Sequence, residues 1–313
     1  MSERLRIVVT CPPMLGAMKH LAGRFAEKGV TVETPNVIQT LSESQLVALV
    51  PGFDGWIIGD DPASRRVFSA GRAGRLRAAV KWGVGMDNVD LDACTDLGIA
   101  IANTPGVFGR EVADVAMSYV TALARETFLI DRGVRQGGWP KPAGISLAGK
   151  IVGLVGFGDI GRQIARRLIA AEMKVIVYDP RFQPHRRLDR VEPSRWPDRL
   201  DEADFLILCC ALTAENRHML NTDTLARTKR GVRLVNVARG PLIDETALLA
   251  GLETGQVHSA ALDVFEVEPL PVGSALRRFE RCVFGSHNSS NTVEAVVRTS
   301  HQAIDLLFDF LSI

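Results

Sequence analysis

The stretch from residue 151 to residue 179 most constrains the fold of this chain. It reads IVGLVGFGDIGRQIARRLIAAEMKVIVYD: an apolar run, the pattern G-x-G-x-x-G, a helical pattern and a second apolar run that ends in Asp179. Elements in this order predict a strand, turn, helix and strand that bind a dinucleotide. We expect Gly156 to make the turn, Gly158 to let the backbone approach a pyrophosphate, and Gly161 to let helix and strand pack closely.

The predicted helix supplies further contacts. Asp159 and Ile160 lie in its first turn, where backbone N–H groups lack helical partners and attract a phosphate. Asp179 stands where a carboxylate accepts hydrogen bonds from the ribose hydroxyls of NAD. Arg181 favours a 2′-phosphate instead, but it follows in a loop, so we expect Asp179 to decide for NAD. A doubly wound fold whose glycine turn binds nothing is the alternative that these residues leave open.

The length of 313 residues favours two domains over one. Apolar strand-like runs alternate with helical patterns before residue 103 and again after residue 150. Such alternation predicts parallel sheets that are covered by helices. The second half contains six strand-like runs, and its polar, proline-broken segment 180–196 is expected to be a loop. A long helix is expected from Phe108.

The final helix, expected from Thr292, has no strand after it, so we expect it to pack on the first domain. The first domain would then be discontinuous. Residues 1–103 together with residues 285–313 are expected to form a substrate-binding domain, and residues 104–284 are expected to form the NAD-binding domain. Ligands of such sheets bind beyond the carboxyl ends of the strands.

Composition narrows the class of partner. The chain carries 37 Lys and Arg against 36 Asp and Glu, a net charge of +1 that gives no basis for a nucleic-acid or membrane-surface partner. No apolar run reaches membrane-spanning length, and the first residues do not form a secretory signal. The five cysteines form neither a C-x-x-C pair nor a disulfide framework. These features favour a cytoplasmic protein, and the histidines lack metal-ligand spacing, so we expect no metal.

Three polar residues follow predicted strands of the second half: Arg239, Glu268 and His287. Reduction of a carbonyl requires a cation that holds the substrate carboxylate, which arginine does with two parallel hydrogen bonds. It also requires a proton donor that titrates near neutral pH, and a carboxylate that stabilises the charged imidazole. Any one of these residues alone is compatible with an ordinary loop. Together, at strand ends, they predict an acid–base site.

A turn in the first half, residues 82–88, also follows a predicted strand. Its sequence WGVGMDN offers exposed backbone N–H groups but lacks the third glycine of a second dinucleotide motif. On the residues alone, a carboxylate-binding turn and a plain turn into the next helix are equally compatible with this sequence.

With these pieces together, the chain resembles the D-isomer-specific 2-hydroxyacid dehydrogenases of the phosphoglycerate dehydrogenase type. The resemblance covers nearly the whole chain and rests on WGVGMDNVD at 82–90, NTP at 103–105, LAGK at 147–150, YDP at 178–180, NVARG at 236–240 and LDVFEVEP at 262–269. It implies an α/β fold of two doubly wound parallel-sheet domains, a central Rossmann domain and a discontinuous flavodoxin-like domain. It also implies a homodimer.

The resemblance further implies an NAD-dependent oxidoreductase that moves a hydride between the cofactor and C2 of a small D-2-hydroxy or 2-oxo acid. The substrates expected are of the phosphoglycerate, glycerate/hydroxypyruvate or glyoxylate type. Arg239 would bind the substrate carboxylate and C2 oxygen, His287 would be the acid–base and Glu268 its partner. Asp263 would contact the nicotinamide carboxamide. Two backbone N–H groups would hold the substrate carboxylate, those of Val84 and Gly85.

One departure from the family pattern concerns the residues after His287. The family usually has a small or apolar residue and then glycine there, whereas this chain has Asn288-Ser289-Ser290, which is expected to add hydrogen bonds in the pocket.

Two alternatives to the main interpretation stay open. One is an NADH-sensing binding protein like the corepressors that resemble this family, and the other is a dehydrogenase that acts on a different acceptor such as phosphonate.

Overall fold

A computed structural model describes residues 4–183, 188 and 190–313, which form two compact units. The first unit contains Met1–Val107 and Asn291–Ile313, and the second contains Phe108–Ser290. These limits lie a few residues after the boundaries expected from the sequence. Every strand pair in both units is parallel, which confirms the expected fold class.

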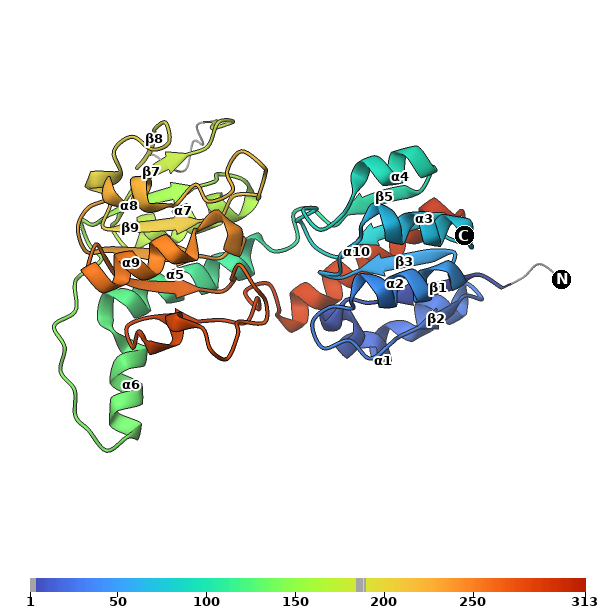
Figure 1. Ribbon diagram of the computed structural model, residues 1–313, viewed down its shortest axis with the longest axis horizontal. Coiled ribbons are helices and arrows are strands. Elements are labelled where there is room, and N and C mark those ends of the chain that lie inside the picture. The colour runs from blue at the N-terminus through green and yellow to red at the C-terminus, as the bar shows by residue number, and fades with distance from the viewer. Residues whose placement is uncertain (1–3, 184–187, 189) are drawn as a thin grey trace. The chain divides into compact units, whose positions relative to one another are not determined.

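The first unit is built on a five-stranded sheet in the order β2-β1-β3-β4-β5, the flavodoxin-like order (Figure 1). Its strands are β1 (Arg6–Val9), β2 (Thr31–Glu33), β3 (Gly55–Ile58), β4 (Ala78–Lys81) and β5 (Ala100–Asn103). The central strands β3 and β4 are buried along their whole length. This burial explains why β3 and the first three residues of β4 are apolar without alternation, as strands covered on both faces are. The last residue of β4, Lys81, is a buried cation.

Helices cover both faces of this sheet. They are α1 (Pro12–Glu27), α2 (Glu43–Leu49), α3 (Arg65–Ala73), α4 (Leu91–Leu97) and α10 (Val293–Leu311). The helix α10 packs on β3, β4 and α1 although it lies at the other end of the chain (Figure 1). The expected capping box is confirmed at α2, because Ser42 accepts from the Gln45 N–H and the Gln45 side chain accepts from the Ser42 N–H.

The second unit is built on a seven-stranded sheet in the order β12-β11-β10-β9-β6-β7-β8. Its strands are β6 (Ile151–Val155), β7 (Lys174–Tyr178), β8 (Val191–Pro193), β9 (Phe205–Leu208), β10 (Val232–Asn236), β11 (Val257–Leu262) and β12 (Val283–Phe284). Counted from β6, the first six strands follow the order of a dinucleotide-binding sheet. The direction of the order reverses between β6 and β9, and ligands bind at such a reversal.

The strand β8 corrects the sequence-based expectation of six strands and a loop over 180–196. It pairs in parallel with β7 at the edge of the sheet. An edge strand tolerates Pro193 because only one side of it forms a hydrogen-bonded ladder. Residues 184–187 and 189 of the same segment lie outside the described part of the chain.

The helices of the second unit are α5 (Gly109–Arg125), α6 (Thr127–Arg135), α7 (Asp159–Ala170), α8 (Thr222–Ala226) and α9 (Glu245–Thr254). The long helix expected from Phe108 is present as α5, and it packs on α7. It stops at Glu126, whose backbone is left-handed at φ 53° and ψ 34°. The next helix, α6, runs in a different direction (Figure 1). Within the described residues, no helix has both the length and the apolar character to span a bilayer.

The packing of α10 on α1 generates a stability prediction. Phe25 and Phe308 form an edge-to-face pair with ring centroids 5.7 Å apart, and both side chains are buried. We expect Phe308→Ala to lower the free energy of unfolding by about 3–5 kcal/mol, the usual loss for a deleted core phenylalanine. Urea unfolding followed by circular dichroism measures this loss.

A matched control lies two residues further along the same helix. The side chain of Phe310 is 37% exposed, so Phe310→Ala should cost less than about 1 kcal/mol. Equal losses for the two variants would contradict the packing of α10 described above.

Candidate active site

The glycine loop lies between β6 and α7, at the reversal of the strand order. Gly156 has φ +100°, which disfavours any other residue, and a Cβ atom added to it would lie 2.8 Å from the Cys210 backbone nitrogen. A Cβ atom added to Gly161 would lie 2.2 Å from the Gly156 carbonyl oxygen. Both glycines are therefore required by close packing. Gly156 lets the turn pack on the residues after β9, and Gly161 lets α7 pack on the turn.

The loop fits the diphosphate of a dinucleotide. No heavy atom lies within 4 Å of a Cβ atom added to Gly158, so this backbone faces open space that a ligand can approach. The helix α7 begins at Asp159, and no side chain caps it. The first N–H groups of α7, including that of Ile160, are consequently available to an anion. The Asp159 carboxylate itself lies against Gly109 at the start of α5.

Asp179 is tied to the glycine loop from the end of β7. One carboxylate oxygen accepts from the Phe157 N–H at 2.6 Å, and the other accepts from the Arg181 N–H at 2.8 Å. These bonds fix the carboxylate beside the loop, and each oxygen keeps a lone pair for a hydroxyl group. The Arg181 side chain is exposed. The geometry therefore suits an unphosphorylated ribose better than a ribose with a 2′-phosphate.

The loop after β10 holds Arg239. The Asn236 side chain accepts from the Ala238 N–H at 3.0 Å and donates to the Arg239 carbonyl at 2.8 Å, so it fixes the loop at both ends. Gly240 packs directly on the next loop, since a Cβ atom there would lie 1.9 Å from the Phe265 carbonyl carbon. The Arg239 side chain is half-buried, and its Nη1 donates to the Ala238 carbonyl at 2.8 Å.

His287 and Glu268 form a hydrogen-bonded pair at the ends of β12 and β11. The Nδ1 atom of His287 lies 2.8 Å from Glu268 Oε2, and both side chains are half-buried. The other oxygen of Glu268 accepts from the Phe265 N–H at 2.9 Å, which orients the carboxylate. His287 has a left-handed backbone, φ 55°, and its N–H donates to the Asp263 carbonyl at 2.7 Å. This arrangement pairs Nδ1 of the His287 ring with the Glu268 carboxylate and so fixes the orientation of the ring.

Asp263 is a buried carboxylate that organises the segment after His287. It accepts from the N–H groups of Asn288 at 3.2 Å and Ser289 at 2.9 Å, and from the Ser289 hydroxyl. Tyr119 on α5 adds a hydrogen bond, and burial together with the Asp263 charge raises the pKa of its phenol. The serine that departs from the family pattern thus contacts Asp263.

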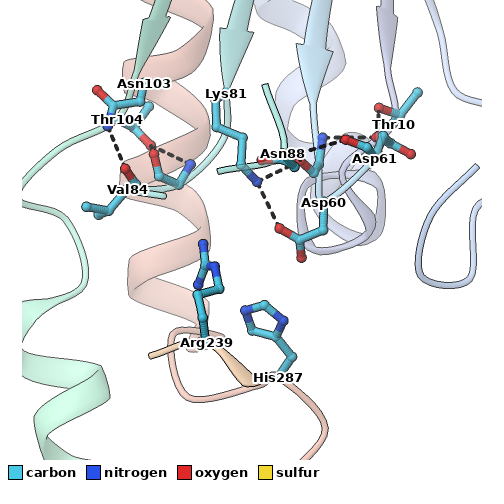
Figure 2. Close-up of polar contacts among 12 residues, drawn as sticks. Thr10, Asp60, Asp61, Lys81, Val84, Asn88, Asn103, Thr104, Arg239 and His287 are labelled. Atoms are coloured by element: carbon cyan, nitrogen blue, oxygen red, sulfur yellow. Dashed lines mark hydrogen bonds and ion pairs between the residues drawn. The ribbon is translucent and has the colours of Figure 1, made fainter. Parts of the chain in front are cut away.

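The turn after β4 in the first unit has the character of an anion site. Within the described chain, the N–H groups of Val84 and Gly85 donate no hydrogen bond. The turn is held from behind, where the Gly83 N–H donates to the Thr104 hydroxyl at 2.8 Å and Asn103 donates to the Val84 carbonyl at 2.7 Å (Figure 2). Two N–H groups that are fixed and unsatisfied suit a carboxylate.

The structure brings Arg239, Glu268 and His287 to the carboxyl ends of three neighbouring strands, β10, β11 and β12, in one unit. Val84 and Gly85 belong to the other unit. Sequence analysis missed the supporting roles of Asn236, Asn103 and Thr104. All three lie in the family-like motifs NVARG and NTP. The match to these motifs was the sequence signal that could have identified them.

This chain is similar in sequence and in structure to known proteins. A model of the NAD-binding domain of D-isomer specific 2-hydroxyacid dehydrogenases matches residues 117–289. A hydroxypyruvate reductase of Thermotoga maritima is 35% identical over 279 residues, which cover 87% of this chain and 90% of that protein. The chloroplastic D-3-phosphoglycerate dehydrogenase 3 of Arabidopsis thaliana is 41% identical over 234 residues, which cover 74% of this chain but only 40% of that protein. The crystal structure of the TT0316 protein from Thermus thermophilus is 31% identical, covers 98% of this chain and 97% of that one, and superposes with a TM-score of 0.88.

Proposed function

The chain belongs to the D-isomer specific 2-hydroxyacid dehydrogenase family, and we propose that it is an NAD-dependent reductase of short 2-oxo acids of the hydroxypyruvate or glyoxylate type. The observation that carries this proposal is the His287–Glu268 pair, 2.8 Å apart, at the strand ends beside Arg239. A proton donor, its carboxylate partner and a cation in one unit with a dinucleotide loop are what carbonyl reduction requires.

The catalytic roles follow from the chemistry of each side chain. Arg239 holds the substrate carboxylate and polarises the C2 carbonyl, since its guanidinium donates parallel hydrogen bonds. His287 donates the proton to the C2 oxygen in reduction and takes it back in oxidation. Glu268 accepts from Nδ1 of His287, which fixes the ring and stabilises its charged form. The dinucleotide supplies the hydride that is delivered to C2.

The cofactor and substrate contacts follow from the open N–H groups and from the two carboxylates described above. The backbone at Gly158, Asp159 and Ile160 faces the pyrophosphate, and Asp179 accepts from the ribose hydroxyls. The buried carboxylate of Asp263 accepts from the nicotinamide carboxamide. In the first unit, the N–H groups of Val84 and Gly85 bind the substrate carboxylate.

Removal of the proton donor tests this assignment. We expect His287→Ala to lower kcat at least about a hundredfold, the usual weight of a positioned acid, while the Kd for NADH stays nearly unchanged. Glu268→Gln should shift the alkaline limb of the pH profile for reduction to lower pH, because the charge that stabilises imidazolium is lost. Steady-state kinetics and fluorescence titration with NADH measure both effects.

Three results would contradict the assignment or redirect it. A His287→Ala variant within a few-fold of the parent would remove His287 from the role of acid. Tight binding of NADH without turnover of any 2-oxo acid would favour a corepressor-like NADH sensor. Turnover confined to an inorganic acceptor such as phosphonate would favour the other alternative.

The fixed carboxylate at the end of β7 generates a prediction on cofactor choice. We expect the parent protein to prefer NADH over NADPH in kcat/KM at least about tenfold, or roughly 1.4 kcal/mol. The reason is that Asp179 is anchored to the loop, whereas an exposed Arg181 contributes only about 1 kcal/mol or less to a phosphate contact. Asp179→Ala should narrow the preference.

Two further variants separate charge from anchoring. Asp179→Asn keeps an acceptor for the Phe157 N–H and removes the charge. It should narrow the preference for NADH over NADPH, with a smaller rise in KM for NADH than Asp179→Ala causes. Adding Arg181→Ala to Asp179→Ala should restore part of the preference. Equal or better turnover of NADPH by the parent would show that Arg181 outweighs Asp179.

We also propose a two-fold homodimer that forms through α6 and the segment after it. The helix α6 buries none of its residues, and in Figure 1 it extends away from the sheet of its unit. Phe128, Val134 and Trp139 are exposed on this part of the chain. A symmetric contact of the same patch on two copies is the usual way to cover such a surface.

Light scattering tests the dimer directly. We expect a mass of two chains of 34.1 kDa at micromolar concentration, and Phe128→Glu should shift the mass towards one chain. Ile38→Glu is the matched control, because Ile38 is an exposed apolar residue of the other unit. A monomeric parent, or dissociation by both substitutions alike, would refute this interface.

The cellular location that we propose is the cytoplasm. All five cysteines are free thiols, and burial raises the pKa of Cys11 and Cys94 to about 12. Unpaired buried thiols of this kind are typical of a reducing compartment.

A further inference from the structure

The backbone of Asp263 connects the loops of the acid–base site. Its N–H donates to the Asn236 carbonyl at 2.9 Å, and the Asn236 side chain holds the loop that carries Arg239. Its carbonyl accepts from the His287 N–H at 2.7 Å. A displacement of Asp263 would therefore change the position of His287 relative to Arg239.

The side chain of Asp263 is held by backbone and side-chain donors. Asp263 is only 3% exposed. The N–H groups of Asn288 and Ser289 donate to its carboxylate, and so do two hydroxyls, those of Ser289 and Tyr119. Hydrogen bonds to a charged group are among the stronger ones, and a buried acid that loses a donor is left partly unsatisfied. The position of Asp263 thus depends on these donors.

Tyr119 approaches this carboxylate from a different element, the helix α5. Tyr119 is only 8% exposed, and α5 packs on β10 and β11. Burial and the Asp263 charge raise the pKa of the Tyr119 phenol, so the hydroxyl keeps its proton and donates a hydrogen bond. A helix of the core therefore anchors an acid that belongs to the loop after β11.

The Tyr119 hydroxyl also lies against the chain just before His287. A Cβ atom added to Gly285 would lie 2.1 Å from Asp263 Oδ1 and 2.5 Å from the Tyr119 hydroxyl oxygen. The space of a side chain at Gly285 is thus occupied by the pair of Tyr119 and Asp263. Two residues later, His287 has a left-handed backbone at φ 55°, a conformation that persists only where the surrounding structure supports it.

We propose that Tyr119 is a positioning residue of the acid–base site, which acts on His287 through Asp263. The Tyr119 hydroxyl holds the Asp263 carboxylate, and the Asp263 carbonyl holds the backbone of His287. The His287 ring then keeps Nδ1 at the Glu268 carboxylate. Tyr119 limits the positions that the ring can adopt and supplies no proton to the reaction. This inference rests on the proposed function, in which His287 is the acid.

Removal of one hydroxyl group tests this role. Tyr119→Phe keeps the buried ring and deletes the donor. We expect kcat for hydroxypyruvate at saturating NADH to fall at least about fivefold, because a hydrogen bond to a charged group is lost. KM for hydroxypyruvate should stay within about twofold, because the loss concerns the reacting geometry and leaves the substrate-binding groups in place. Steady-state kinetics measure both constants.

Proton NMR reports the position of the His287 ring without any substrate. In the parent we expect a far-downfield resonance from the proton between His287 Nδ1 and Glu268, which His287→Ala removes and so assigns. Tyr119→Phe should weaken this resonance or move it upfield. The pair of His218 and Glu266 gives an internal control from the same loop, and its resonance, assigned with His218→Ala, should stay in place.

Tyr178→Phe is the matched control, because the chain has two tyrosines and the Tyr178 hydroxyl donates to an uncharged group, the Asp198 carbonyl, at 2.7 Å. It should leave kcat within about twofold and the His287 resonance unchanged, since distant sites act independently. Ser289→Ala removes the other hydroxyl donor to Asp263 and should act in the same direction as Tyr119→Phe. It decides the question if Tyr119→Phe does not fold.

Several outcomes would overturn this inference while the proposed function stands. One is a folded Tyr119→Phe variant whose kcat lies within about twofold of the parent value. Another is a lower kcat with an unchanged His287 resonance, and a third is an equal shift of the His218 resonance, which would indicate a general disturbance of the loop. A parent without turnover of any 2-oxo acid would overturn the proposed function, and the resonance would then still decide whether Tyr119 positions His287.

Discussion

The contact between Gly240 and the backbone of Phe265 sets the spacing of the whole acid–base site. With no side chain between them, the loop after β10 touches the loop after β11, and a single added carbon atom would have to displace the Phe265 carbonyl. Arg239 is adjacent to this contact on one loop, and Glu268 lies three residues beyond it on the other. The relative position of the cation and the carboxylate is therefore fixed by main-chain packing, which deforms less readily than long side chains do.

Asp263 extends this rigidity to His287. Its carbonyl accepts from the His287 N–H, and its carboxylate accepts from the two residues that follow. The left-handed backbone of His287 is a strained conformation for a residue with a Cβ atom, and these hydrogen bonds offset part of that strain. The three loops thus form one connected structure, in which the histidine ring is set by Glu268 and its backbone by Asp263.

The sequence allowed prediction of the parts that depend on local pattern. Glycines at fixed spacing, the acid after the second strand and the polar residues at strand ends all follow from short-range geometry, and the fold class follows from alternation of strands and helices. The strand β8 was missed because it lies in a polar, proline-rich segment, and only pairing with β7 makes its three residues a strand. The end of α5 was missed because no glycine or proline marks Glu126.

The contacts that support the site residues could not be predicted from the sequence, for a related reason. The hydroxyl of Ser289 was expected to add hydrogen bonds in the pocket, but its partner Asp263 lies 26 residues away in the sequence. The pairing of Lys81 with Asp60 spans 21 residues and depends on β3 and β4 being neighbours. Such contacts are determined by the tertiary fold, and a pattern in the sequence identifies the residue type without identifying its partner.

The two edge strands of the seven-stranded sheet affect the tendency of the protein to aggregate. An open edge strand presents unpaired N–H and C=O groups on which another chain can add, and long flat edges are starting points for aggregation. Here one edge is β8, a strand of three residues that includes exposed Glu192 and Pro193, and the other is β12, with two residues. Neither edge is long enough to template a further strand, and the proline contributes no N–H at all. The same polar, proline-rich composition that concealed β8 in the sequence thus protects a large parallel sheet from edge-to-edge association.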